Sequence, residues 1–176
     1  MKAAQITEPD KPLELNQIEL SEPTGNQVLL KVISTGVCHS DLHLWEGGYD
    51  TGDGFMKVTD RGVKFPVTPG HEVVGIVEKI GESVKDIKIG ETFLVYPWIG
   101  CGECPTCKKG DTNLCESPKS LGVFQDGGYA EKVIVPDYKF LANIGELDPD
   151  SASSLACSGL TAYTAIKKAL SNAPES

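Results

Sequence analysis

Long hydrophobic runs are absent from this sequence. No apolar stretch near the N-terminus resembles a signal peptide, and no run approaches the roughly 20 residues that a membrane-spanning helix needs. We therefore expect a cytoplasmic protein without a membrane partner, in a reducing compartment where disulfides are rare. The 176 residues suit one domain, which can bury its core without disulfides. In that setting, the six cysteines more often bind metal than pair with one another.

Positive charge is also scarce. The chain has 16 Lys and Arg residues against 25 Asp and Glu residues, which gives a formal net charge of −9. A phosphate backbone or an anionic membrane surface rewards Lys and Arg, so neither is expected as the main partner. Divalent metal ions bound by the six cysteines as thiolates would not reverse this balance. We therefore predict no nucleic-acid partner and disfavour a DNA-binding zinc finger.

A dinucleotide-binding fingerprint is missing as well. Such a fold is marked by G-x-G-x-x-G between a strand and a helix, with an acidic residue about 20 positions further on. No segment of the sequence has this pattern, and no internal repeat is found. We therefore expect no Rossmann domain within these residues.

Several short segments rich in Val and Ile, bounded by Gly, Pro or Asp, are typical of β-strands. They are Val28 to Ser34, Val73 to Ile80, Thr92 to Val95 and Ala130 to Val135. Many short strands separated by turn residues predict a mainly β, mostly antiparallel barrel or sandwich with a few helices.

Two helices are predicted. Apolar residues at helical spacing indicate one from about Ser158 to Leu170. A short helical turn is expected from Ser40 to Trp45, with Ser40 or Asp41 as its cap.

Residues 46–64 contain many Gly and Asp residues, which predicts a mobile loop. A calcium-binding loop is the alternative for this composition. Counted from Asp50, however, ligand positions 3, 5 and 12 fall on Gly52, Gly54 and Arg61, which offer no carboxylate. Calcium is therefore not expected here.

Four cysteines lie within 15 residues, spaced C-x2-C-x2-C-x7-C; they are Cys101, Cys104, Cys107 and Cys115. This density suits one tetrahedral zinc ion, which binds thiolates at about 2.3 Å. Nearby glycines and Pro105 allow the tight turns that such a lobe, about residues 97–118, requires. The alternative is a pair of disulfides or idle thiols. Because four protein ligands leave no open position, this zinc is expected to be structural.

The remaining chemistry-bearing residues lie far apart in the sequence. Taken singly, Cys38 and Cys157 suit buried small hydrophobic positions, and His71 suits a core histidine. Their local contexts, however, resemble a known family. The motifs are V-C-H-S-D-L-H at 37–43, P-G-H-E-V-V-G at 69–75, the cysteine lobe, D-G-G-Y-A-E at 126–131 and C-S-G-L-T-A-Y at 157–163. Together they resemble the catalytic domain of zinc-dependent medium-chain alcohol dehydrogenases, especially archaeal-type members.

This resemblance spans nearly all of residues 1–176 and implies a GroES-like antiparallel barrel with a projecting zinc lobe. It also implies a second, catalytic zinc ion bound by Cys38, His71 and Cys157, with one position left for water or alcohol. Glu72 resembles the family's glutamate that can approach the metal from behind. Asp41 resembles the carboxylate that fixes the tautomer of the histidine ligand. The alternatives are a surface Glu and a helix-capping Asp.

The implied reaction oxidises an alcohol to an aldehyde or ketone, through a zinc-bound alkoxide and hydride transfer to NAD or NADP. A small alcohol or carbonyl compound is the expected substrate. Ser40 resembles the hydroxyl that contacts the alcohol oxygen, and His43 the histidine that passes the proton outward. His39 occupies the family's position near the cofactor pyrophosphate. Solvated polar side chains are the alternative for all three. Trp98 and Trp45 are expected either to line the substrate cleft or to belong to the core.

The sequence stops at about the point where family members pass into their cofactor domain. We therefore expect a truncated dehydrogenase with very weak or no turnover by itself, and self-association through apolar surface exposed on residues 158–170. The alternative function is a non-catalytic zinc-binding interaction module that keeps the barrel. The zinc-free quinone reductase branch is disfavoured, because it has no use for either ligand set. The particular alcohol, and NAD versus NADP, stay open.

Overall fold

The computed structural model describes residues 1–171. Its strands are β1 (Lys2–Gln5), β2 (Glu14–Gln17), β3 (Val28–Gly36), β4 (Gly48–Asp50), β5 (Phe55–Lys57), β6 (Glu72–Ile80), β7 (Thr92–Val95), β8 (Lys132–Val135) and β9 (Leu141–Asn143). Its α-helices are α1 (His39–Trp45), α2 (Pro105–Lys108), α3 (Pro149–Ala152) and α4 (Ser158–Ser171). Its 3-10 helices are η1 (Val58–Arg61), η2 (Thr112–Leu114), η3 (Tyr138–Phe140) and η4 (Ser153–Ala156).

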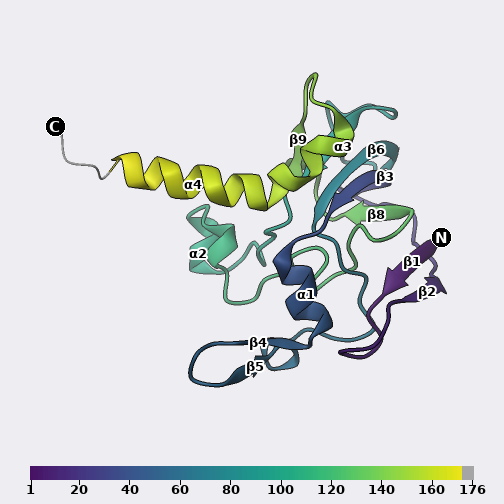
Figure 1. Cartoon of the computed structure of the whole chain (residues 1–176). Helices are drawn as coiled ribbons and strands as arrows, with labels where there is room; N and C mark the ends of the chain where they lie inside the picture. The colour runs from purple at the N-terminus through teal and green to yellow at the C-terminus, as the bar shows by residue number, and fades with distance from the viewer. Residues whose placement is uncertain (172–176) are drawn as a thin grey trace.

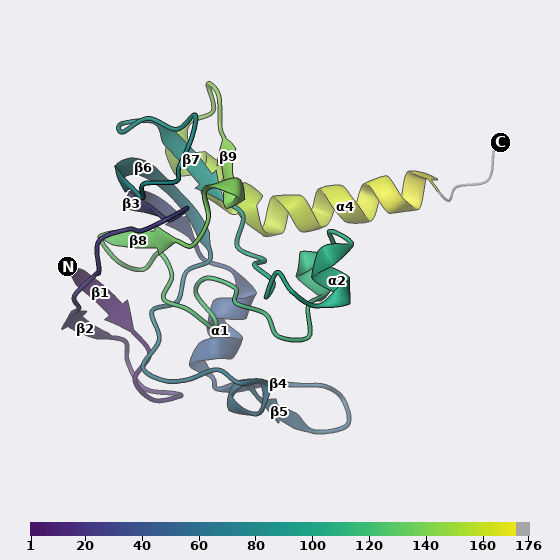
Figure 2. The same cartoon turned by 180° about the vertical axis from the view of Figure 1, so that it is seen from behind.

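The centre of the molecule is a five-stranded sheet in the order β8-β3-β6-β7-β9, and every neighbouring pair is antiparallel (Figures 1 and 2). Two further two-stranded sheets pair β1 with β2 and β4 with β5. The predicted strands are therefore confirmed as β3, β6, β7 and β8, and the mainly β, antiparallel fold is confirmed. Within the described residues, the hydrogen-bonded sheets are open.

The main core lies against the central sheet. Strands β7 and β8 alternate between buried and half-buried residues, as expected for strands that turn one face to a core. Fully buried β-branched and aliphatic side chains of β3, β6, β7 and β8 meet there; they include Val28, Leu30, Val73, Val77, Val95 and Val135. Each such side chain contributes about 1.5–3 kcal/mol when fully buried, so this cluster fixes the register of the strands.

The β3–β6 ladder sets the position of the residues that follow it. Gly36 at the end of β3 pairs with Glu72 at the start of β6, so Cys38 and His71 lie at the same end of the sheet. Helix α3 packs at this end as well, because Ala152 is buried against Val74. Cys157, which follows η4, therefore lies at this end of the sheet as well.

Two local predictions need correction. Residues 46–64, predicted as a mobile loop, contain the β4–β5 hairpin and η1, since Val58 and Val63 are buried against Leu44. The N-cap of α1 is Cys38 and not Ser40 or Asp41. Asp41 lies at the third helical position, where its carboxylate accepts a hydrogen bond from the Cys38 N–H at 2.9 Å and closes the first turn.

Helix α4 confirms the helix predicted near residues 158–170. It projects from the body of the molecule (Figure 1) and buries none of its residues. Tyr163, Ile166 and Leu170 are 62%, 60% and 71% exposed. An apolar face is therefore open to solvent along this helix. No helix in residues 1–171 is both long enough and apolar enough to cross a membrane.

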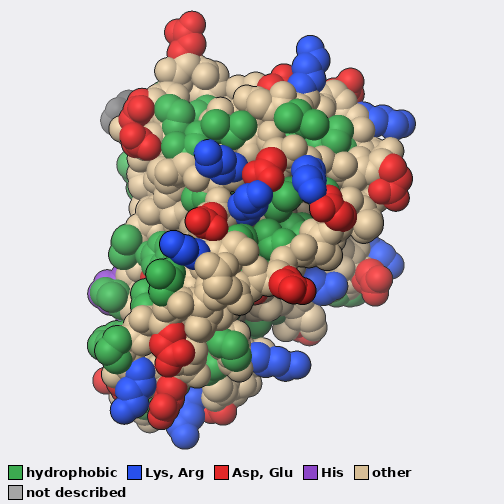
Figure 3. Space-filling view, turned by 90° about the vertical axis from the view of Figure 1, so that its right-hand side faces the viewer, with side chains coloured by type: hydrophobic (Ala, Val, Ile, Leu, Met, Phe, Trp, Pro, Cys, Tyr) green, Lys and Arg blue, Asp and Glu red, His purple; other side chains and the backbone are tan. Residues whose placement is uncertain are grey.

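The face of the molecule opposite the free end of α4 carries charges of both signs. Figure 3 shows Lys and Arg side chains interspersed with Asp and Glu side chains around hydrophobic ones. This face therefore presents no continuous basic surface of the kind that phosphate backbones favour.

Candidate metal centres and catalytic site

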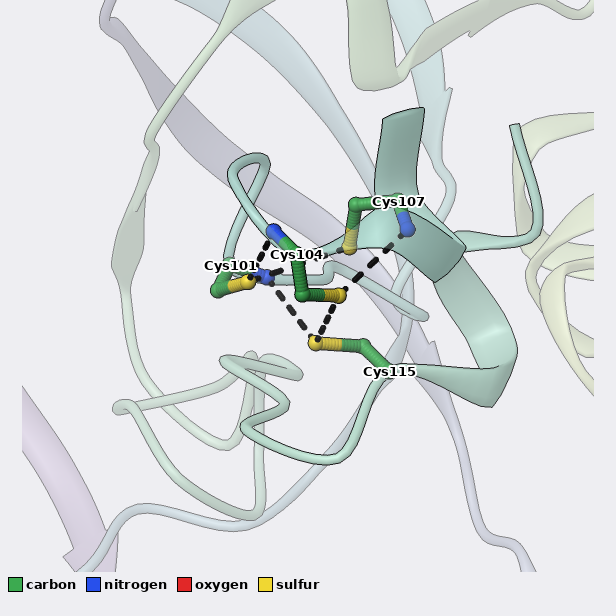
Figure 4. A group of neighbouring side chains, drawn as sticks. All are labelled: Cys101, Cys104, Cys107 and Cys115. Carbon is green, nitrogen blue, oxygen red and sulfur yellow. Dashed lines mark hydrogen bonds between the residues drawn. The ribbon is translucent and has the colours of Figure 1, made fainter. Parts of the chain in front are cut away.

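The four clustered cysteines turn their sulfur atoms toward one another in the lobe around α2 (Figure 4). Their ligand atoms all lie within 4.8 Å of one another. The Cys104 and Cys115 sulfurs are 3.8 Å apart, and those of Cys101 and Cys107 are 4.0 Å apart. A disulfide needs about 2.05 Å, whereas sulfurs about 2.3 Å from a shared tetrahedral ion lie about 3.8 Å apart. The arrangement therefore fits one closed four-thiolate metal site.

The backbone of the lobe is arranged around the sulfur atoms. The N–H groups of Cys104 and Cys107 each donate to the sulfur of the cysteine three positions before, at 3.4 Å. Gly100 leaves room for the cluster, because a Cβ there would lie 2.5 Å from the Cys107 sulfur. Gly102 and Gly110 have φ of +82° and +95°, which L side chains rarely adopt. The predicted need for tight glycine turns is therefore confirmed at these positions.

The pKa values of two thiols in this cluster, Cys101 and Cys107, shift in opposite directions when no cation is bound. Backbone N–H groups of Glu103 and Cys104 lower the pKa of Cys101 to about 6. Although the Gly102 N–H opposes the change, burial and the neighbouring thiols raise the pKa of Cys107 to about 12. Four ionised thiols this close together would repel one another, and a bound divalent cation would offset that repulsion. The donor set therefore fits zinc.

The second cluster combines residues from three distant segments. Cys38 precedes α1, His71 and Glu72 lie at the start of β6, and Cys157 joins η4 to α4. Ligand atoms of these four residues all lie within 4.8 Å of one another, and the two sulfurs are 3.9 Å apart. The structure therefore brings together the residues that the sequence motifs could only associate by resemblance.

The His71 ring provides the test of whether a metal fits. It is 1% exposed, and neither ring nitrogen makes a hydrogen bond within the described residues. Nδ1 still has Asp41 Oδ1 3.5 Å away, so Nε2 is the nitrogen left without a partner. Buried polar atoms without partners are rare and call for an absent ligand. Burial lowers the pKa of His71, but Asp41 and Cys157 outweigh it and raise that pKa to about 10. Surroundings that favour a proton so strongly also favour a divalent cation, so two thiolates and an imidazole fit zinc here.

Asp41 links the backbone around this cluster to the His71 ring. One carboxylate oxygen accepts from the Gly70 N–H at 3.0 Å and lies 3.5 Å from His71 Nδ1; the other accepts from the Cys38 N–H. Although burial opposes the change, contact with His71 and these backbone donors lowers the pKa of Asp41. Asp41 is therefore placed to orient the histidine ring. The helix-capping alternative for Asp41 holds as well, because the same carboxylate accepts from the Cys38 N–H and lies beside His71.

Glu72 is buried beside the cluster, and the surface alternative for it is wrong. It is 1% exposed, and one carboxylate oxygen accepts hydrogen bonds from the N–H and the hydroxyl of Ser158. Its other oxygen faces Gly36, where a Cβ would lie only 2.0 Å away.

A cavity of about 310 Å³ opens beside the second cluster. Ser40 and Trp98 are both in its wall; the Ser40 hydroxyl is 3.7 Å from the Cys38 sulfur, and the Trp98 ring is 5.6 Å from the His71 ring. None of the four residues of the second cluster is itself in the wall, so Ser40 and Trp98 stand between the cavity and that cluster. His43 lines this cavity and also a second, outer hollow that His39 borders. Trp45 instead packs against the hydrophobic core around Leu44 and donates its N–H to the Lys11 carbonyl.

Sequence reasoning missed four contributors to the site. They are Gly36, Arg61, Tyr129 and Ser158. Arg61 lines the cavity, and the Tyr129 hydroxyl donates to Asp41 at 3.4 Å. Burial and the Asp41 charge raise the pKa of Tyr129, which keeps this hydroxyl a donor. Ser158 directly follows Cys157, and that adjacency was the one available signal for it.

Comparison with known proteins shows that this chain is similar to alcohol dehydrogenases in both sequence and structure. A family model described as "Alcohol dehydrogenase GroES-like domain" matches residues 24–146. The NAD-dependent alcohol dehydrogenases of Sulfurisphaera tokodaii and Saccharolobus solfataricus are each 44% identical over 169 residues, which cover 96% of this chain and 48% of the relative. The solved alcohol dehydrogenase of Aeropyrum pernix superposes with a TM-score of 0.83 at 30% identity, covering 98% of this chain and 49% of that one. The chain spans about half the length of the curated relatives it matches.

Proposed function

Because this chain belongs to the alcohol dehydrogenase GroES-like domain family, we propose that it is the catalytic-domain portion of a zinc-dependent NAD(P) alcohol dehydrogenase. The observation that carries the proposal is the convergence of Cys38, His71 and Cys157, with a buried imidazole whose Nε2 has no partner among the described residues. These three would hold the catalytic zinc, with Glu72 able to approach it. The four cysteines of the lobe would hold a structural zinc. The substrate is a small alcohol or the corresponding carbonyl compound.

When bound, zinc would supply Lewis acidity that lowers the pKa of an alcohol hydroxyl, and the nicotinamide of NAD or NADP would accept the hydride. The chain's own residues handle the proton. The Ser40 hydroxyl borders the cavity beside Cys38, where it can accept a hydrogen bond from the substrate hydroxyl. His43 borders both the cavity and the outer hollow, so its imidazole can carry the proton toward solvent. His39, exposed beside His43, is available to a cofactor phosphate.

The surroundings of these residues also suit the reaction. Apolar side chains form most of the cavity wall, which favours the carbon chain of an alcohol and limits water. Asp41 lies beside His71 Nδ1 and accepts a hydrogen bond from Tyr129, so it can orient the His71 ring. We also propose a reducing, cytoplasmic location, in which six cysteines that form no disulfide stay available as metal ligands.

Turnover by the 176 residues alone is expected to be very weak or absent. The sequence has no G-x-G-x-x-G segment, so the nicotinamide would lack its main binding surface and the hydride acceptor would not be positioned. Robust NAD-dependent ethanol oxidation by the purified chain would overturn this expectation.

Metal analysis tests the proposal without requiring turnover. We expect two zinc ions per purified chain, one in a Cys38→Ser variant that stays folded, and loss of lobe structure in Cys104→Ser. A Ser40→Ala variant serves as the control and should keep both ions, because its hydroxyl is not a proposed ligand. One zinc in the wild-type chain, with Cys38→Ser unchanged, would favour the alternative of a non-catalytic zinc-binding interaction module. No zinc at all would refute both.

A further inference from the structure

The cavity beside the second cluster (Cys38, His71, Glu72 and Cys157) has one permanently charged side chain among its described wall residues. Most of the residues in its wall are apolar, such as Leu44, Val58 and Val63. None of the described residues that line it is Asp or Glu, and Arg61 is the only Lys or Arg. An apolar cavity with a few placed polar groups is typical of a small-molecule site, in which those groups determine specificity.

Arg61 is held at the cavity by a well-anchored backbone. It is the last residue of η1, and Gly62 ends that helix with φ of +92°. Val58 at the start of η1 and Val63 just after it are 8% and 4% exposed, and both belong to one buried cluster. The guanidinium therefore extends from a segment fixed on both sides, although the side chain itself reaches solvent.

The positive charge of Arg61 is not neutralised within the protein. Among residues 1–171, no carboxylate lies within ion-pair distance of it. Its guanidinium donates only to the Met56 sulfur, at 3.8 Å. A thioether is a weak acceptor and carries no charge, so most of the five N–H donors of Arg61 stay available.

The positive charge of Arg61 contrasts with the negative charge of the whole chain. With a net charge of −9, the protein repels anions at long range. An anionic group bound in this cavity would therefore depend on a nearby cation, and Arg61 is the only Lys or Arg among the described residues of its wall. A planar guanidinium matches a carboxylate with two parallel hydrogen bonds, which also fixes the orientation of the bound group.

Building on the proposed function, we propose that the substrate is a hydroxy acid, or the matching carbonyl acid, whose carboxylate pairs with Arg61. The hydroxyl or carbonyl end then lies toward Ser40 and the catalytic cluster. The carbon chain between the two ends packs against the apolar wall. Arg61 is thus a specificity residue: it selects the substrate through the end that does not react.

Ligand binding to the zinc-loaded 176-residue chain tests this inference, because no cofactor domain is needed. NMR titration would compare 5-hydroxypentanoate with 1,5-pentanediol, which has the same carbon chain but no negative charge. We expect the hydroxy acid to bind about fivefold to tenfold tighter, the range of a partly exposed charge-assisted pair. In Arg61→Gln the two dissociation constants should become about equal, whereas Arg61→Lys should keep part of the preference.

Two controls separate this effect from others. Lys85→Gln removes the same charge from an exposed site outside the cavity and should keep the full preference. Cys38→Ser weakens the proposed catalytic zinc site and so reports whether the carboxylate binds the metal instead. A preference that survives Arg61→Gln but disappears in Cys38→Ser would overturn the proposed role of Arg61, as would a wild-type chain that binds both ligands equally. The zinc content of every variant is measured as well. It tests the zinc sites of the proposed function independently of the ligand preference.

Discussion

Ser158 donates two hydrogen bonds to a single oxygen of Glu72, from its hydroxyl at 2.7 Å and from its backbone N–H at 3.0 Å. This contact ties the first turn of α4 to the first residue of β6. The carboxylate also satisfies a backbone donor that the start of a helix leaves without a partner. Because Cys157 immediately precedes Ser158, the same contact fixes one proposed zinc ligand relative to another, His71, which immediately precedes Glu72.

Replacing Ser158 with Ala removes the hydroxyl bond and leaves the buried Glu72 carboxylate less satisfied. We expect the free energy of unfolding to fall by about 1–3 kcal/mol, as for other hydrogen bonds to charged groups. Chemical denaturation of the zinc-loaded chain measures this change. Ser154→Ala is the matched control, because that hydroxyl is exposed and makes only a 3.5 Å contact. Equal losses in the two variants would contradict the role of Ser158.

Gly36 should tolerate no side chain while Glu72 is present. A Cβ at Gly36 would lie 2.0 Å from the second Glu72 oxygen, so Gly36→Ala must displace a buried carboxylate. We expect a loss of at least about 1–3 kcal/mol, typical of overpacking. In a Glu72→Ala background the same substitution should cost less, because the carboxylate is gone and only the Cβ of residue 72, at 3.0 Å, stays close. Additive losses in the double variant, measured by denaturation, would argue against this contact.

The parts of the molecule that depend on local sequence could be predicted. Segments rich in Val and Ile and bounded by turn residues predicted β3, β6, β7 and β8, because this composition is a short-range signal. The cysteine lobe was equally readable, because its four ligands lie within 15 residues. The second cluster was different: it depends on the β3–β6 register and on the packing of α3, and neither can be read from spacing. Only the family resemblance associated Cys38 with Cys157.

The same distinction explains the features that were missed. The Gly and Asp residues of segment 46–64 indicate turns, but the anchoring of η1 by Val58 and Val63 depends on partners such as Ile6, far away in sequence. The position of Arg61 in the cavity wall follows from that anchoring. Nothing in the residues around Arg61 distinguishes it from an ordinary surface cation.

Zinc removal should loosen the lobe before the sheet. In the proposed structural site, one zinc ion bound by four thiolates would hold residues 101–115 together, and α2 has only four residues of its own. After treatment with a strong chelator, hydrogen exchange of the lobe amides should accelerate by at least about 100-fold, since structural zinc contributes many kcal/mol. Amides of β3 and β6 in the buried core serve as the internal control. Uniform acceleration across the chain would contradict an independent lobe.

Helix α4 should mediate self-association of the 176-residue chain. Tyr163, Ile166 and Leu170 expose a continuous apolar stripe, and such surfaces favour contact with another molecule. Light scattering at increasing concentration should show dimers or larger species, and Ile166→Glu should shift them toward monomer. Ser171→Glu adds the same charge to the same helix and should have a smaller effect. A wild-type chain that stays monomeric at high concentration would show that this face does not associate.

Asp148 should make stability depend on pH at the start of α3. The hydroxyl and backbone N–H of Ser151 donate to its carboxylate at 2.7 Å and 3.0 Å, and these bonds lower the pKa of Asp148 in the folded chain. A lowered folded pKa means that the stabilisation is complete above the unfolded value, about 3.9, and is lost as the pH falls through the folded value. The stability difference between wild type and Asp148→Asn should therefore shrink as the pH is lowered from about 6 to about 3. Denaturation across this range measures the difference, with Asp53→Asn in the β4–β5 hairpin as the control for loss of a remote carboxylate. A wild-type advantage that stayed constant down to the lowest pH would mean that the Asp148 charge does not stabilise this helix.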